Sequence, residues 1–284
     1  MEPDRTIDLP QGQVRYRDLG AGEAILFIHG LLVDGTLWRK VTPHLQDQYR
    51  CIVPDWPLGS HQVGLADAAD RSPRGIANLI ADFMAALELE NVTVVANDTG
   101  GAIAQLLVTE RPQRVGRLVL TPCDAYENFL PPAFRPLQWL ARVPGALALA
   151  LAPMRSAVLR RSPLGFGLLS KSVIPDEITA RWVAPALSDR AIRRDVIGLL
   201  RGIDPRDTLA AAEKLRSFDR PTLIAWAPED PFFKLRFAER LAQAIPDCRL
   251  ELIYDSRTFV PEDQPERLGE LIAEFAQSPT ASTG

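Results

Sequence analysis

The strongest constraint on the fold is a repeated alternation between short apolar runs and longer amphipathic stretches. The apolar runs have the length of strands and cover residues 24–28, 51–54, 92–95, 117–120, 222–226 and 249–253. The stretches between them have helical periodicity, over residues 37–45, 75–87, 102–110 and 265–275. Buried strands that alternate with helices are typical of a mostly parallel α/β sheet, because helices then cover both faces.

The interval 124–219 interrupts this alternation. It contains no convincing strand, and its periodicity predicts helices over 137–151, 176–187 and 189–200. Prolines stand near both of its ends, and proline marks element boundaries. The sequence therefore predicts a core domain of residues 1–123 and 220–277, a helical insertion at 124–219, and a disordered tail at 278–284.

Composition narrows the class of protein. The chain has 284 residues, 46% of them hydrophobic, and a net charge of -4, which favours a folded protein and speaks against a nucleic-acid partner. The longest uncharged, mostly apolar run, 143–154, is too short to span a bilayer, so we expect no membrane partner. The N-terminus is polar and acidic, unlike a signal peptide.

The cysteines indicate the compartment and the absence of a metal site. Cys51, Cys123 and Cys248 show no CxxC spacing, so no structural zinc is expected. Few cysteines favour a reduced, cytoplasmic protein. We expect no metal and no cofactor, and a small molecule as the partner. A monomer and a homodimer both remain open.

The most informative segment is 92–102, in which a strand meets a tight turn and then a helix. Asp98 stands at the centre of the turn, with small residues around it at Ala96, Gly100 and Gly101. This pattern is that of a nucleophile elbow, which exposes its central side chain above the sheet. The following helix N-terminus favours an ionised Asp98, whereas burial opposes ionisation. A carboxylate that only caps the helix is the alternative.

Over nearly its whole length the chain resembles the α/β-hydrolase superfamily. Segment 27–32 resembles the oxyanion loop, and segment 54–61 resembles the turn after the fourth strand. The resemblance implies an eight-stranded, mostly parallel sheet with a helical cap inserted after the sixth strand. It also implies an oxyanion hole formed by the backbone amides of Leu31 and Thr99. The triad acid would be Asp230, in segment 225–230, while Asp124 stands at the other place where relatives carry that acid.

An aspartate at the elbow is similar to the haloalkane dehalogenase and epoxide hydrolase branch. There a carboxylate attacks an sp3 carbon and forms an ester, which a histidine near the C-terminus then hydrolyses by activating water. In this chain Thr258 stands at that position, and none of the three histidines, His29, His44 and His61, follows residue 61. A threonine hydroxyl is not basic near neutral pH, so the second half-reaction is missing.

Further departures separate the chain from each branch. Thr99 and Leu31 replace the Trp and Asn that hold halide in the dehalogenases. Tyr126 is the only tyrosine in 124–219, where epoxide hydrolases carry two. His61 is the one histidine that could substitute as a base, and His29 is expected to brace the oxyanion loop.

The candidate pocket residues beyond the elbow come from several segments. Asp230 either shares a proton with Asp98 or bonds to loop amides, and the cap aromatics either line an apolar pocket or pack. The candidates for the pocket are His29, Asp124, Tyr126, Trp139, Trp182, Thr258 and Phe259.

These observations leave three functional hypotheses. The first is an enzyme that acts on a small, largely apolar molecule through Asp98, with Asp230 as a second catalytic carboxylate. The lost histidine favours proton-transfer chemistry there, as in a lyase, isomerase or cyclase. The second is an Asp-nucleophile hydrolase of the dehalogenase or epoxide hydrolase type. The third is an inactive, ligand-binding relative, because a fold alone does not fix a function.

Overall fold

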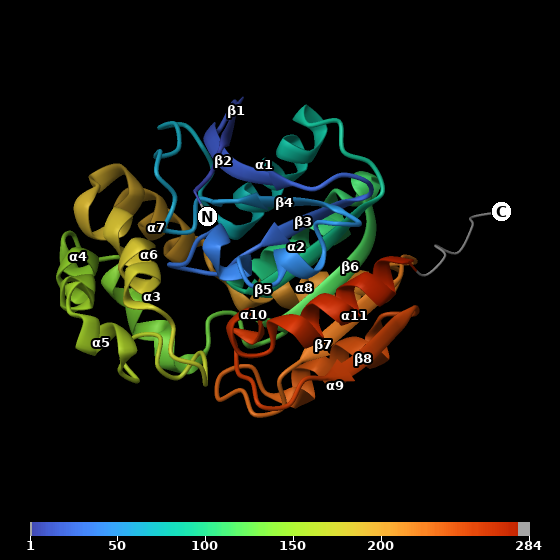
Figure 1. Ribbon diagram of the computed structural model, residues 1–284. Helices are drawn as coiled ribbons and strands as arrows, with labels where there is room; N and C mark the ends of the chain where they lie inside the picture. The colour runs from blue at the N-terminus through green and yellow to red at the C-terminus, as the bar shows by residue number, and fades with distance from the viewer. Residues whose placement is uncertain (1, 278–284) are drawn as a thin grey trace.

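A computed structural model describes residues 2–277 and contains an eight-stranded sheet with helices on both faces (Figure 1). The strands follow the order β1-β2-β4-β3-β5-β6-β7-β8. The strand bounds are β1 Arg5–Leu9, β2 Gly12–Leu19, β3 Ala24–Ile28, β4 Arg50–Pro54, β5 Val92–Asp98, β6 Val115–Cys123, β7 Thr222–Trp226 and β8 Cys248–Leu252. The predicted disordered tail, 278–284, lies outside the described residues.

The sheet is mixed, and its antiparallel part lies at one edge. Strand β2 pairs antiparallel with both β1 and β4, whereas the pairings from β4 through β8 are parallel. Antiparallel neighbours can be joined by a tight turn, and β1 and β2 are only two residues apart. The predicted mostly parallel eight-stranded sheet is therefore confirmed, with β1 and β2 as its antiparallel exception.

Alternating side chains of the central strands bury both faces of the sheet. On one face, Leu26 and Val94 pack with helices α1 Pro73–Ala86, α2 Thr99–Glu110, α8 Pro205–Leu215 and α9 Leu235–Ala244. On the other face, Phe27 and Val95 pack with α11 Pro265–Gln277 and with the short 3-10 turns η1 Gly35–Trp38 and η2 Thr42–His44. Period-two alternation of this kind is what a strand buried on both faces requires.

Short helices after β6 form the cap, which lies to one side of the sheet in Figure 1. They enclose a small apolar cluster that includes Leu130, Leu147 and Leu200. The elements are η4 Pro132–Phe134, α3 Arg135–Leu140, α4 Ala146–Leu151, η5 Ala152–Arg155, α5 Ala157–Arg161, α6 Asp176–Ser188 and α7 Arg190–Gly202. Helix α8 also falls within the predicted interval 124–219, but it packs against α2 on the core.

Two predicted helices differ in the structure. The interval 137–151 is split into α3 and α4 because Pro144 and Gly145 intervene, and Gly145 adopts a left-handed φ of 77°. The interval 37–45 forms only η1 and η2, with Pro43 inside the second turn. Within residues 2–277, no helix is both long and apolar enough to cross a bilayer.

Candidate active site

Asp98 occupies a strained turn between β5 and α2. Its backbone has φ 57° and ψ -134°, a region that residues with a Cβ rarely adopt. The small residues predicted around Asp98 are required because neighbouring segments approach the turn closely. A Cβ on Gly100 would overlap the carbonyl oxygen of His29, and a Cβ on Gly101 would overlap the Cys123 side chain. The strand and helix backbones can therefore meet tightly, as the elbow pattern predicts.

The carboxylate of Asp98 lies against the loop that follows β3. A Cβ on Gly30 would overlap one of the Asp98 carboxylate oxygens, so glycine is needed at this position. Burial raises the pKa of Asp98 to about 7, the backbone amides of Thr99 and Leu31 oppose this rise, and the charge of Asp230 adds to it. The two amides expected to form the oxyanion hole therefore act on the carboxylate of Asp98 itself.

Asp230 and Thr258 form a buried pair next to this site. The Thr258 hydroxyl donates to Asp230 Oδ2 at 2.7 Å, and the amides of Phe232 and Phe233 donate to Oδ1 at 2.7 and 2.8 Å. Burial raises the pKa of Asp230 to about 6, against the lowering effect of these three hydrogen bonds. The bonds to loop amides, one of the two open alternatives for Asp230, are present. Sharing of a proton with Asp98 stays a prediction, although the charge of Asp230 does raise the pKa of Asp98.

Asn97 is a member of the site that the sequence did not single out. Its Nδ2 donates to the carbonyl oxygen of Thr258 at 2.7 Å and to Thr121 Oγ1 at 2.8 Å. It thereby ties the loop after β8 to the end of β5, directly beside Asp98. A polar side chain at the end of a buried apolar strand was the available signal for this role.

Asp124 is completely buried at the end of β6. The amide of Leu130 donates to its Oδ1 at 3.0 Å, and Gln105 Nε2 donates to its backbone carbonyl at 2.8 Å. Burial and the charge of Asp98 raise the pKa of Asp124 well above its usual range. Burial therefore favours the neutral form of Asp124, and its side chain does not line the cavity.

The histidines are engaged in structural contacts. The amide of Trp56 donates to His29 Nε2 at 2.8 Å, so His29 Nδ1 carries the proton and donates to the carbonyl of Gly30 at 2.9 Å. Burial lowers the pKa of His29 to about 4, so the ring is neutral and braces the loop as expected. It lies outside the lining of the cavity.

His61 is also occupied. The amide of Gly59 donates to its Nδ1 at 3.3 Å, and its Nε2 lies 3.1 Å from Asp195 Oδ2. His61 therefore joins the turn after β4 to α7 of the cap, and it does not line the cavity. His44 lies in η2 and packs against Gly269 of α11. Neither ring reaches Asp98 through a hydrogen bond among the described residues.

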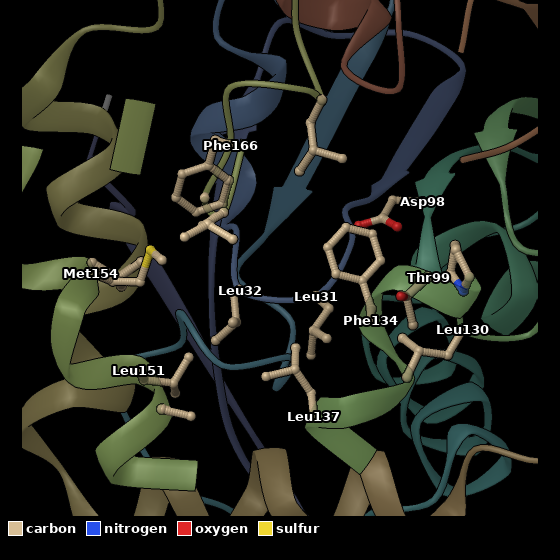
Figure 2. A pocket seen from close by; sticks show the side chains of 16 residues that line it. Leu31, Leu32, Asp98, Thr99, Leu130, Phe134, Leu137, Leu151, Met154 and Phe166 are labelled. Carbon is tan, nitrogen blue, oxygen red and sulfur yellow. The ribbon is translucent and has the colours of Figure 1, made fainter. Parts of the chain in front are cut away.

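A cavity of about 150 Å³ lies between the elbow and the cap. Asp98 and Thr99 carry the only polar side chains among the residues that line it in the described part of the chain. Its walls are aliphatic and aromatic, and include Leu31, Phe134 and Phe166. Figure 2 shows Asp98 and Thr99 on one side of the lining and Leu151 and Met154 of the cap on the other. The cavity therefore suits a small, apolar molecule presented to a single carboxyl group.

The profile of the family described as alpha/beta hydrolase fold matches residues 23–265. The protein belongs to the alpha/beta hydrolase fold family. The fold and the superfamily resemblance predicted from the sequence are thereby confirmed.

Several relatives in this family match nearly the whole chain. An uncharacterized protein of Mycobacterium tuberculosis is 29% identical over 284 residues, covering 92% of this chain and 77% of the relative. Haloalkane dehalogenase 2 of Mycobacterium tuberculosis is 26% identical over 285 residues, covering 95% and 93%. Cis-3-alkyl-4-alkyloxetan-2-one decarboxylase of Xanthomonas campestris is 28% identical over 296 residues, covering 97% and 96%.

Solved structures of the alpha/beta hydrolase fold agree in architecture. A putative ancestral haloalkane dehalogenase superposes with a TM-score of 0.78 at 24% identity, covering 96% of this chain and 100% of that one. At this level of identity the likeness concerns the fold. The position that the resemblance assigns to the base of this family holds Thr258, hydrogen-bonded to Asp230.

The predicted aromatic pocket residues lie outside the cavity. Trp139 is 65% exposed on α3, and Trp182 is buried, where its Nε1 donates to Thr36 Oγ1 at 2.8 Å. The ring of Phe259 packs edge-on to Trp182 at 5.7 Å, and Tyr126 stacks under the guanidinium of Arg240 at 3.8 Å. Of the two alternatives left open for such side chains, these four follow packing or exposure to solvent, and none of them is among the described residues that line the cavity. The wall is instead formed by Phe134, Phe166 and aliphatic residues.

Proposed function

We propose that this protein is an enzyme that transforms a small, largely apolar molecule with Asp98 as its catalytic carboxyl group, by a reaction that does not use histidine-activated water. The observation that carries the proposal is the cavity itself. Among the described residues that line it, Asp98 carries the one ionisable side chain, and apart from Thr99 the others are apolar. Burying an ionisable carboxyl group among apolar side chains lowers the stability of the fold, and destabilising groups of this kind are typical of functional sites.

The pKa of Asp98, raised to about 7, suits proton transfer. Both its neutral and its charged form are populated near neutral pH, so it can give or take a proton without a large energetic penalty. We therefore propose a lyase, isomerase or cyclase in which Asp98 donates a proton to the bound molecule or accepts one from it. The amides of Leu31 and Thr99 would stabilise negative charge on Asp98 or on the substrate during the reaction.

Asp230 has a supporting part in this proposal. Its oxygens accept three hydrogen bonds, and its side chain does not line the cavity, so direct contact with substrate is not part of its proposed role. Its charge raises the pKa of Asp98, and it accepts a hydrogen bond from Thr258, which stands at the position of the histidine. Asp230 is thus proposed as a positioning residue that keeps Asp98 partly protonated.

The relatives support chemistry of two kinds. One carries a name for decarboxylation of a dialkyl-substituted oxetan-2-one, a non-hydrolytic reaction on a substrate with two alkyl groups. Another is named haloalkane dehalogenase, which favours the second candidate, an Asp-nucleophile hydrolase. The specific observation for that second candidate is the elbow geometry, which presents Asp98 to the cavity beside the Thr99 and Leu31 amides. The occupied ring nitrogens of His61 and His29 count against it.

The proposal is tested with a substrate screen in water labelled with ¹⁸O. Dialkyl oxetan-2-ones, alkyl halides and epoxides are incubated with the wild-type protein, with Asp98→Asn, and with Asp47→Asn as a control on the exposed surface. We expect catalytic turnover without ¹⁸O in the product, lost in Asp98→Asn and kept in Asp47→Asn. Repeated turnover with ¹⁸O in the product would favour the hydrolase. Turnover that survives Asp98→Asn would contradict a catalytic role for this residue.

A further inference from the structure

The cap carries an unusual concentration of positive charge. Between Glu127 and Asp176 the sequence holds six basic residues and no acidic residue, although the whole chain has a net charge of -4. Two of the six are paired, because Arg160 bonds to Asp176, and Lys171 bonds to Glu229 and Asp255. The other four are exposed and have no acidic partner within the described residues: Arg135, Arg142, Arg155 and Arg161.

The same segment exposes large apolar side chains. They lie on α3, α4 and α5, in the turn between α3 and α4, and in the loop that follows α5. Helices α4 and α5 are at the edge of the cap farthest from the sheet in Figure 1. The exposed fractions of these apolar side chains range from 55% to 80%, and the residues are Trp139, Val143, Leu149, Val158, Leu164 and Val173. Exposed apolar side chains among basic ones mark a surface that binds something both apolar and negatively charged.

This surface reaches the lining of the cavity. Leu164 is 80% exposed and at the same time lines the cavity that contains Asp98. Phe166, which lines the same cavity, also lines a second cavity of about 150 Å³ beside it, together with Arg160, Arg161 and Lys171. An apolar molecule entering at Leu164 would therefore pass directly from the exposed apolar surface of the cap to Asp98.

We propose that the cap docks on the surface of a bilayer that contains anionic lipids. Trp139 and the exposed aliphatic side chains would enter the boundary between headgroups and acyl chains, while the four arginines meet the phosphates. A lipid surface fits better than an acidic protein because it supplies negative charge and hydrocarbon together, and because the exposed Leu164 of the patch also lines the cavity. The expectation of no membrane partner rested on the lack of a spanning segment, which a surface contact does not need.

The docking adds a substrate source to the proposed function, and in this respect it rests on that proposal. Apolar molecules concentrate in the hydrocarbon of a bilayer, so a cavity that opens at its surface draws on that pool. Binding to the bilayer itself does not require Asp98. Vesicle binding therefore separates the two proposals, since Asp98→Asn should lose turnover and still bind vesicles as the wild type does.

The experiment is sedimentation of the full chain with vesicles of mixed phosphatidylglycerol and phosphatidylcholine, compared with pure phosphatidylcholine. We expect binding to the anionic vesicles only, weakened by added salt. Trp139 provides a second signal, because the other four tryptophans, Trp38, Trp56, Trp182 and Trp226, are fully buried. A shift of tryptophan emission to shorter wavelength on binding would therefore report the entry of Trp139 into the lipid.

The charge contribution is tested with Arg135→Gln/Arg142→Gln. Each basic side chain near an anionic surface strengthens binding about fivefold, so the double variant should bind about thirtyfold more weakly. The matched control, Arg216→Gln/Arg267→Gln, removes the same charge from α11 and from the residue that follows α8, and should bind as the wild type does.

Four results would overturn the proposal. Three concern vesicles: no binding to anionic vesicles at low salt, equal binding to pure phosphatidylcholine, and an equal loss in both double variants. The fourth is a dimer in lipid-free solution that buries Trp139, because it would assign the patch to a second copy of the chain.

Discussion

Replacing Asp98 by asparagine should make the folded protein more stable at and above neutral pH. Asparagine has nearly the same shape and tolerates the left-handed φ of 57° at this turn, but it cannot ionise. In the wild type, a carboxyl group with an ordinary pKa of 3.8 is held in a place that raises its pKa to about 7. Ionising the carboxyl group in this buried place lowers the free energy of unfolding of the wild type, whereas the variant cannot ionise and keeps that free energy.

The size of this effect follows from the shift. The pKa of Asp98 rises from its ordinary 3.8 to about 7 in the native state, and each tenfold change in proton affinity corresponds to about 1.4 kcal/mol. Below about pH 4 the group is protonated in both states, so it costs nothing. As the pH rises to about 7, the native state holds a proton that the unfolded chain has lost, so stability falls. Above about pH 7 the full cost, at most about 4 kcal/mol, is present.

Chemical denaturation between about pH 4 and pH 8 measures this difference. Asp98→Asn should exceed the wild type in free energy of unfolding by up to about 4 kcal/mol at about pH 8, and the gap should close towards pH 4. Asp47→Asn, on the exposed surface, should change stability by less than about 0.5 kcal/mol. If the two proteins have the same free energy of unfolding at about pH 8, or differ by the same amount at about pH 4 and about pH 8, this explanation of Asp98 is refuted.

Three other substitutions test the surroundings of Asp98. Thr258→His places an imidazole beside the site, so an alkyl ester trapped on Asp98 should be hydrolysed at least about tenfold faster than in Thr258→Ser, as followed by mass spectrometry. Equal ester lifetimes in the two variants would contradict the assigned position of Thr258. Gly30→Ala puts a Cβ against the Asp98 carboxylate, so the rate of alkylation of Asp98 should fall at least about tenfold. An unchanged rate would show that the loop after β3 moves to accommodate the added Cβ. His61→Asn should lower the free energy of unfolding by about 1–3 kcal/mol and leave the alkylation rate of the folded protein within about twofold, whereas a selective loss of that rate would identify His61 as a base.

The sequence predicted those parts of the fold in which local pattern decides. Strands β3 and β7 begin and end where the apolar runs do, because a strand buried on both faces needs a continuous apolar run. The elbow at Asp98 was predictable from its small neighbours. The place of Thr258 was predictable, because its spacing to Asp263 and Pro265 preserves the register of the superfamily, whereas its hydrogen bond to Asp230 was not predicted.

The lining of the cavity could not be read from the sequence. Periodicity predicts which side of a helix is apolar, but Pro144 and Gly145 break the predicted helix and redirect its two halves. Trp139 therefore faces solvent, while Phe166, from a loop without periodicity, lines the cavity. The contact of His61 with Asp195 was equally hidden, because it joins residues far apart in the chain through the docking of the cap.

The most direct test of the central claim is the fate of an alkyl group transferred to Asp98. The protein is mixed with an excess of an alkyl bromide, and halide release and intact mass are followed together. We expect one alkyl group per chain, on Asp98, as an ester that persists because no base reaches it. Halide release should then stop at one equivalent. Halide release over many equivalents, with no ester accumulating, would contradict the claim that Asp98 works without a water-activating base.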